Sequence, residues 1–268
     1  MNHLQGAAAP AKRYPFQILT GYGLKMLGLV FMVLDHIHQM FSPFGAPLWL
    51  TMLGRVVLPI FLFMASEGFC HTRSRPKYAF RLLIGFWGMG LGNLLLSQAF
   101  PLQDVALVNN VFGTVLVSVF YMWMVDLALQ SLRQKNILKF FLSLLGFLAP
   151  IFSSVLLLLI LQAGAPLWVM QLVMVLMPGL LTVEGGYAAV VLAVAFYLLR
   201  KNRWLQLIPL VLVSILSALG GGIQWLMVFA AIPILLYNGA AGRKSKYFFY
   251  IFYPAHIYLL YLVSYFLH

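Results

Sequence analysis

An acid and two imidazoles follow directly on an apolar run near the start of the chain. Residues 24–34 are apolar or glycine with the exception of Lys25, and Asp35, His36 and His38 come next. An ionisable group at the centre of a membrane helix costs roughly 2.5–3.5 kcal/mol on insertion scales, so such groups normally face a bundle interior or a wet cavity. Because histidine titrates near neutral pH, this segment is a candidate site for proton transfer.

Helical geometry separates the roles of these neighbours. Successive residues differ by 100° around a helix, so Asp35 does not simply orient His36. Gln39 lies three residues beyond His36 and shares its face, whereas His38 shares a face with Asp35. His36 is therefore the better candidate for facing a cavity, and we expect His38 near the outer interface without a ligand.

A single cation lies inside the second apolar segment. Arg55 occurs in GRVVLPIF, and the turn SPFGAP joins this segment to the first. Folding the two helices antiparallel about that turn sets His36 level with Arg55. Asp35 or His36 is the expected partner, since an unpaired arginine in hydrocarbon is costly. Such a pair could serve chemistry or could only fix the hairpin.

A further histidine lies in the last apolar segment, KYFFYIFYPAHIYLLYL. His256 lies about ten residues, or about 15 Å, from the basic end of this segment. His36 lies eleven residues beyond Lys25, so the two imidazoles are expected at similar depth. Alternatively, His256 only bonds to a backbone carbonyl that Pro254 leaves free.

The elements that carry these residues are membrane helices. The 268 residues are 63% hydrophobic and 8% charged, with a mean hydropathy of +0.96, whereas soluble domains carry about 25% charged residues. A span needs about 20 apolar residues. We predict an all-α, polytopic integral membrane bundle with about nine spans: 23–41, 49–69, 80–100, 109–130, 139–162, 185–199, 205–220, 223–238 and 247–267.

The remaining segments complete the predicted topology. Residues 167–184 are expected to form a short, re-entrant or extracytoplasmic helix that ends at Pro178-Gly179, because a full span there would invert every later basic cluster. Residues 1–22 are interpreted as a cytoplasmic or interfacial segment, and 23–268 as a single transmembrane domain.

The net charge of +12 comes from basic residues gathered between the spans. This pattern is typical of the positive-inside rule, so we expect a bacterial inner-membrane protein with a cytoplasmic N-terminus and no nucleic-acid partner. Cys70 is the only cysteine, which excludes an intramolecular disulfide. The histidines are too few and too separated for a three-ligand zinc site, and no nucleotide-binding or nucleophile-elbow motif occurs in a suitable context.

Three blocks of sequence together resemble the TraX family of membrane proteins. They are MVLDHIHQMF, GRVVLPIFLFMASEGFCHTRSRPKYAFRL and LLYNGAAGRKSKYFFYIFYPAHIYLL. The family is named for the conjugative-pilin acetylase and is similar to the wider group of multi-span acyltransferases that use cytosolic acyl-CoA. The resemblance covers about 24–267, although 139–184 carries little recognisable pattern.

The resemblance implies acyl transfer within the membrane, from acetyl-CoA to an amine or hydroxyl such as a protein N-terminus. In the wider group a histidine in the first of these helices is thought to serve catalysis. That role is carried onto His36 as general base, with Asp35 and Arg55 beside it, while His256 matches the closing motif. Arg55 or His256 could stabilise the oxyanion in a site of low dielectric constant.

The donor implied by the resemblance is charged and cytosolic. Its phosphates cannot enter hydrocarbon, so we expect them at the cytoplasmic helix ends on cations that clamp anions well. The candidate cations are Arg73, Arg75, Lys77, Arg243, Lys244 and Lys246. The expected partners are the lipid bilayer, the acyl-CoA donor and an acceptor protein or small molecule, with no metal cofactor.

Two other classes of function remain open from the sequence. A proton-coupled transporter or flippase could use Asp35, His36 and His256 as a relay, because polar groups at mid-membrane also mark ion paths. A non-catalytic membrane subunit could use the same polar pairs only to lock its bundle. Release of CoA by the purified protein would separate the acyltransferase from both.

Overall fold

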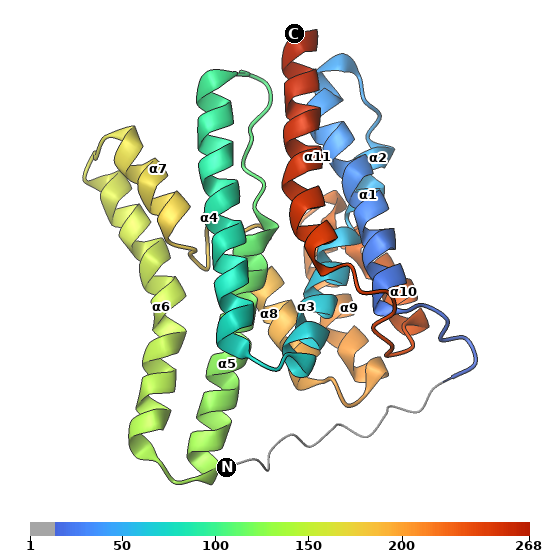
Figure 1. The fold of residues 1–268 in the computed structure, drawn as a ribbon, viewed down its shortest axis with the longest axis vertical. Helices are drawn as coiled ribbons and strands as arrows, with labels where there is room; N and C mark the ends of the chain where they lie inside the picture. The colour runs from blue at the N-terminus through green and yellow to red at the C-terminus, as the bar shows by residue number, and fades with distance from the viewer. Residues whose placement is uncertain (1–13) are drawn as a thin grey trace.

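Helices alone build the described part of the chain, residues 14–268 of a computed structural model (Figure 1). Within these residues the only strand-like pairing is an isolated bridge between Leu19 and Tyr237. The predicted segment 1–22 falls largely outside the described residues, since 1–13 are not among them, and its placement stays a prediction.

Six stretches of the described chain are long and apolar enough to cross a membrane, so the predicted polytopic helical bundle is confirmed. They are α1 (Gly21–Phe41), α2 (Trp49–Gly54) together with α3 (Val57–His71), α4 (Arg75–Ala99), α5 (Val111–Arg133), α6 (Ile137–Gln162) and α11 (Lys246–Leu267).

The other helices are shorter, and apart from η1, which lies in the SPFGAP turn, they correspond to three of the nine predicted spans and to the predicted short helix. They are η1 (Ser42–Phe44), α7 (Leu167–Leu176), α8 (Gly186–Leu198), α9 (Arg203–Leu219), η2 (Ile223–Ala230) and α10 (Ala231–Leu236). Glycines explain two of the interruptions. Gly185 and Gly186, at the start of α8, adopt positive φ angles of 76° and 55°, and Gly221 does so at 76° between α9 and η2.

The basic loops lie at one end of the bundle. The α3–α4, α5–α6, α8–α9 and α10–α11 connections all lie toward the lower end in Figure 1, and the C-terminus lies at the upper end. We call the lower end the basic end. Its clustering of Lys and Arg matches the positive-inside pattern, and the side of the membrane that it faces stays a prediction.

A proline breaks the second span at its arginine. Pro59 has no N–H and cannot bond to the Arg55 carbonyl, so α2 ends at Gly54 and α3 begins at Val57. Gly54 permits the close approach of α1, because a Cβ at this position would overlap the carboxylate of Asp35. The break thus brings Arg55 out of regular helix and against the first span.

An irregular segment runs back into the bundle between α7 and α8. The Leu180 N–H donates to the Pro150 carbonyl at 2.9 Å, the Leu181 N–H donates to Ser154 Oγ at 3.0 Å, and Ser153 Oγ donates to the Pro178 carbonyl at 3.0 Å. Irregular backbone at membrane depth needs such partners. These hydrogen bonds to α6 satisfy backbone groups of residues 177–185. The segment can therefore run into the interior of the bundle, where α8 starts (Figure 1).

The first and last helices are aligned at both ends. The start of α1 is hydrogen-bonded to the chain that leads into α11, with the Gly21 N–H on the Ala240 carbonyl at 2.7 Å and the Tyr22 N–H on the Ala241 carbonyl at 3.0 Å. Near the other end, Ser264 Oγ donates to the Met40 carbonyl at 2.7 Å. This register places the histidines of the two helices at the same level.

Candidate active site

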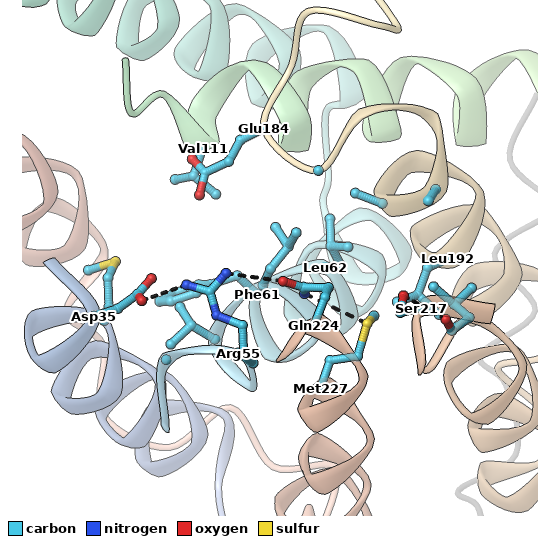
Figure 2. Close-up of a pocket in the computed structure, with 18 of the residues that line it drawn as sticks. Asp35, Arg55, Phe61, Leu62, Val111, Glu184, Leu192, Ser217, Gln224 and Met227 are labelled. Atoms are coloured by element: carbon cyan, nitrogen blue, oxygen red, sulfur yellow. Dashed lines mark hydrogen bonds and ion pairs between the residues drawn. The ribbon is translucent and has the colours of Figure 1, made fainter. Parts of the chain in front are cut away.

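A cavity of about 200 Å³ opens between α1, the α2–α3 break, α8, α9 and η2 (Figure 2). Its polar lining includes Asp35, His36, Arg55, Glu184 and Gln224, which come from four separate parts of the chain. Glu184 lies deep within the bundle yet is exposed, because its side chain faces this cavity. A polar chamber in an otherwise apolar bundle is the default candidate for a site.

A directed chain of hydrogen bonds fixes the two histidines. His36 Nδ1 lies 2.7 Å from His256 Nε2, and His256 Nδ1 lies 2.8 Å from the Phe252 carbonyl oxygen. A carbonyl only accepts, so Nδ1 of His256 carries the proton and its Nε2 accepts from His36 Nδ1–H in the neutral pair. This assignment, which follows from the partners, leaves the lone pair of His36 on Nε2.

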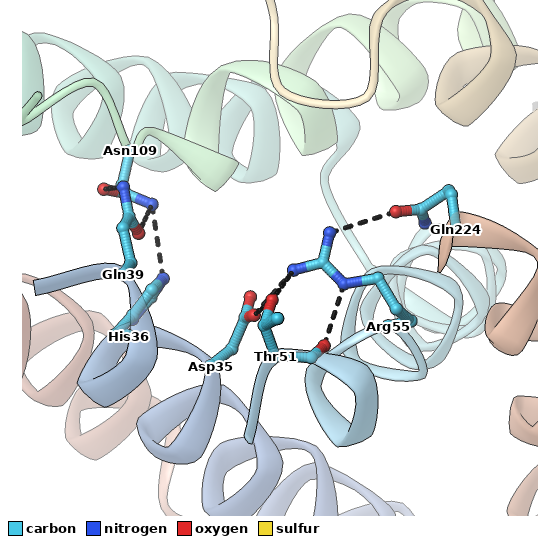
Figure 3. A network of polar contacts seen from close by, with 7 residues as sticks. All are labelled: Asp35, His36, Gln39, Thr51, Arg55, Asn109 and Gln224. Atoms are coloured by element: carbon cyan, nitrogen blue, oxygen red, sulfur yellow. Dashed lines mark hydrogen bonds and ion pairs between the residues drawn. The ribbon is translucent and has the colours of Figure 1, made fainter. Parts of the chain in front are cut away.

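An amide side chain holds the free nitrogen of His36. Asn109 Nδ2 lies 3.3 Å from His36 Nε2, and Asn109 also exchanges two hydrogen bonds of 3.0 Å with Gln39 (Figure 3). The bond to His36 is longer than the usual 2.9–3.0 Å for N–H donors. An incoming N–H or O–H group could therefore take the place of this amide on Nε2.

The Arg55 guanidinium lines the same cavity as His36 and makes four hydrogen bonds. Arg55 Nη2 donates to Asp35 Oδ1 at 2.6 Å and to Thr51 Oγ1 at 2.7 Å. Nη1 donates to Gln224 Oε1 at 3.1 Å, and Nε donates to the Thr51 carbonyl at 3.0 Å (Figure 3). A guanidinium has five N–H groups, so one N–H of Nη1 is left without a partner among these bonds.

Of the two expected partners of Arg55, the structure selects Asp35. Their ion pair is 2.6 Å long, and Thr51 Oγ1 donates a further hydrogen bond of 2.5 Å to the same carboxylate oxygen. Asp35 thus orients Arg55, while His256 and Asn109 hold His36. His38 bonds to the Ala46 carbonyl at 3.0 Å and does not line the cavity, which agrees with its expected place near the interface.

Three polar residues of the site were not predicted from the sequence. Asn109 and Glu184 each lie two residues before the start of a helix, and Gln224 is the second residue of η2. They belong to irregular segments, where no periodicity reveals which side chains face inward. The one available signal was their position as isolated polar residues beside breaks in apolar runs.

The cations proposed to bind the donor lie outside this cavity. Arg75 forms an ion pair with Asp126 and stacks on Phe69 at 4.5 Å from the ring centroid. The other four with described side chains are exposed, namely Arg73, Lys77, Arg243 and Lys244. The side chain of Lys246 lies outside the described part. Their role in binding phosphate stays a prediction.

No group of three metal-binding side chains occurs within the described residues. His36 and His256 contact each other directly at 2.7 Å, and both are buried, with 3% and 8% of their surface exposed. The pair is therefore arranged to pass or share a proton between two nitrogens.

Comparison with known proteins adds the family. No solved structure matches this chain. A curated relative, the probable fimbrial assembly protein FimC of serogroup H1 from Dichelobacter nodosus, is 27% identical over an alignment 266 residues long, and the alignment covers 90% of this chain and 94% of the relative. The family described as TraX protein matches residues 21–264, a range that includes both histidines and Arg55. This chain therefore belongs to the TraX family.

Proposed function

We propose that this chain is an integral membrane acyltransferase that moves an acetyl group from acetyl-CoA to an amine or hydroxyl acceptor. The observation that carries the proposal is the directed chain from His36 to His256 and the Phe252 carbonyl, which leaves His36 Nε2 as a base. His36 lines a cavity that also holds a guanidinium with one N–H not used in a hydrogen bond.

The proposed reaction is a single acyl transfer. The acceptor nitrogen or oxygen attacks the thioester carbonyl carbon, and His36 Nε2 takes up the proton that the acceptor loses. The new C–N or C–O bond forms as the C–S bond breaks. The sulfur leaves as a thiolate and receives the proton from His36, so CoA is released as the free thiol and the histidine returns to its neutral form.

His256 acts as the positioning residue in this scheme. It accepts the Nδ1–H of His36 and so keeps Nε2 unprotonated and aimed away from α11. When His36 becomes cationic, the positive charge is shared along the chain to the Phe252 carbonyl. This support resembles in purpose the carboxylate of a catalytic triad, with an imidazole in its place.

Arg55 would stabilise the negative charge that develops on the thioester oxygen. Donors fixed in advance in a site of low dielectric constant are worth far more than donors in water. Asp35, Thr51 and Gln224 hold the guanidinium in place, so it need not reorganise during the reaction.

The acceptor that we propose is the terminal amine of a pilus or fimbrial subunit embedded in the same membrane. The support is the similarity to a relative that is named a probable fimbrial assembly protein. An α-amine has a pKa near 7.7–8.0 in water, and burial favours its neutral, nucleophilic form. A free amine brought into the cavity would therefore need only one proton acceptor.

The test is thiol release by the purified protein in nanodiscs, with acetyl-CoA and a peptide that has a free N-terminus. His36→Gln should lower turnover at least about a hundredfold, the usual contribution of a general base. His38→Gln is the matched control on the same helix and should stay within about twofold. If His36→Gln retained more than about a tenth of the wild-type turnover, the activation free energy would have risen by less than ~1.4 kcal/mol, and this would contradict the assignment of His36 as general base.

A proton-coupled transporter is the second candidate, and one observation favours it. The polar cavity and a second cavity toward the basic end share four lining residues, as expected of a gated path. Proton movement in liposomes without acetyl-CoA, together with no thiol release, would select this function.

A further inference from the structure

A second cavity, of about 340 Å³, lies toward the basic end between α1, α3, α4 and α11. Its lining is mostly apolar and aromatic. Two cations are among the lining residues, namely Lys25 near the start of α1 and Arg81 in the second turn of α4.

Neither cation has a counter-charge. Among the described residues, the ion pairs are those of Asp35 with Arg55 and Asp126 with Arg75, and no carboxylate lines this cavity. Lys25 Nζ lies 5.6 Å from the ring centroid of Phe249, a cation–π contact that leaves its charge unneutralised.

The guanidinium of Arg81 is partly unsatisfied as well. Its Nε is buried without a hydrogen-bond partner, and the phenol of Tyr250 is a neutral neighbour. Burying charge without an opposite charge is costly. Two unbalanced cations in one apolar chamber are the arrangement expected where a bound anion completes the site.

The two cavities meet at a shared wall. Met32, Phe61, Val111 and Tyr253 line both of them, and Tyr253 also packs against His36 with 6.4 Å between the ring centroids. Lys25 and His36 are eleven residues apart on one helix, a rise of about 16 Å. A ligand anchored at Lys25 would need an extended arm of about this length to present a reactive carbonyl at His36.

We propose that the second cavity binds the phosphate groups of the acyl donor through Lys25 and Arg81, and that the acyl arm passes the shared wall to His36. This inference rests on the proposed acyltransferase function and names its donor site. The exposed loop cations Arg73 and Lys77 then only attract the donor over a longer range. A lipid phosphate could offer the same chemistry, so the experiment must distinguish the two sources.

The experiment measures binding of CoA to the purified protein in nanodiscs made of neutral phosphatidylcholine alone. Lys25→Met and Arg81→Met should each weaken CoA binding about tenfold or more, the loss expected for a charge-assisted hydrogen bond. The loop variants Arg73→Gln and Lys77→Met test the rival binding site at the helix ends and should change CoA binding less than about threefold. Lys25→Arg keeps the charge and should retain binding, which guards against a variant that merely misfolds.

The outcomes separate this inference from the proposed function. Equal effects of cavity and loop variants on CoA affinity would overturn the cavity site while leaving the acyltransferase proposal intact. Binding of anionic phosphatidylglycerol but not of CoA, lost in Lys25→Met, would assign the cavity to lipid and overturn both. Met32→Trp should block the passage between the two cavities and so abolish acyl transfer while CoA still binds. Undiminished transfer by this variant would refute the passage.

Discussion

Replacing Arg55 with methionine tests whether this cation is structural, catalytic or both. Methionine keeps most of the apolar stem but removes four hydrogen bonds, two of which join charged Arg55 to the Asp35 and Thr51 side chains. A hydrogen bond to a charged group is worth ~1.5–3 kcal/mol, and breaking a fully buried pair costs ~3–5 kcal/mol.

The expected loss lies below the fully buried case. The two side chains are 25% and 22% exposed to the cavity, and Asp35 keeps the hydroxyl of Thr51. Water in the cavity can solvate the remaining carboxylate. We therefore expect Arg55→Met to lower the free energy of unfolding by about 2–3 kcal/mol, and the thermal midpoint by about 4–10 °C.

The assay combines thermal unfolding in nanodiscs with turnover. A double-mutant cycle with Asp35→Asn should give a coupling energy of about 1–2 kcal/mol. Turnover should fall about 10²–10³-fold if Arg55 also stabilises the oxyanion. Arg200→Gln, an exposed arginine bonded to the Tyr197 carbonyl, is the control and should spare turnover. An unchanged midpoint with zero coupling would refute the ion pair as a stabilising contact.

Three shorter predictions concern packing, the free nitrogen and topology. Gly54→Ala forces the carboxylate of the neighbouring aspartate aside and should lower the thermal midpoint by several degrees, whereas Gly88→Ala meets open space and should be neutral or slightly stabilising. Asn109→Ala should leave turnover within about fivefold, because this amide only occupies His36 Nε2 until the acceptor arrives; a hundredfold loss would make Asn109 part of the chemistry. A cysteine placed in the α8–α9 loop of a cysteine-free variant should resist impermeant thiol reagents in intact cells, and labelling from outside would reverse the topology.

The common depth of the two histidines could be predicted because regular helices carry positional information. A helix rises 1.5 Å per residue, so counting from Lys25 and from the basic end of the last span placed His36 and His256 level. The short SPFGAP turn likewise fixed the register of Arg55 against the first span. In each case the chain between the reference point and the residue is almost continuous helix.

Counting fails where the chain enters the bundle as irregular backbone. Residues 177–185 reach the interior because Pro150, Ser153 and Ser154 of α6 satisfy their backbone groups, and no local pattern indicates that docking. Glu184 was therefore missed. The ion pair of Arg75 was not foreseen for a related reason, since its partner Asp126 lies 51 residues away.

The convergence of helix starts explains how a bundle of this composition tolerates two carboxylates near its centre. Figure 1 shows the α4–α5 connection running down beside α4 before α5 begins, and α8 also begins inside the bundle. Val111, Gly185 and Gln224, at or next to the starts of α5, α8 and η2, all line the polar cavity. A helix N-terminus carries a partial positive charge and unpaired N–H groups, which favour anions.

The carboxylates use these groups together with Arg55. Glu184 lines the cavity together with Val111 at the start of α5, and Asp35 pairs with the guanidinium. The electric field of the helix starts and of Arg55 stabilises these carboxylates. The same field would also stabilise a transient oxyanion near His36, because the dipoles that produce the field are fixed and need not reorient. The interrupted helices therefore bring three helix starts, with the N–H groups that they leave unpaired, to the cavity that His36 lines.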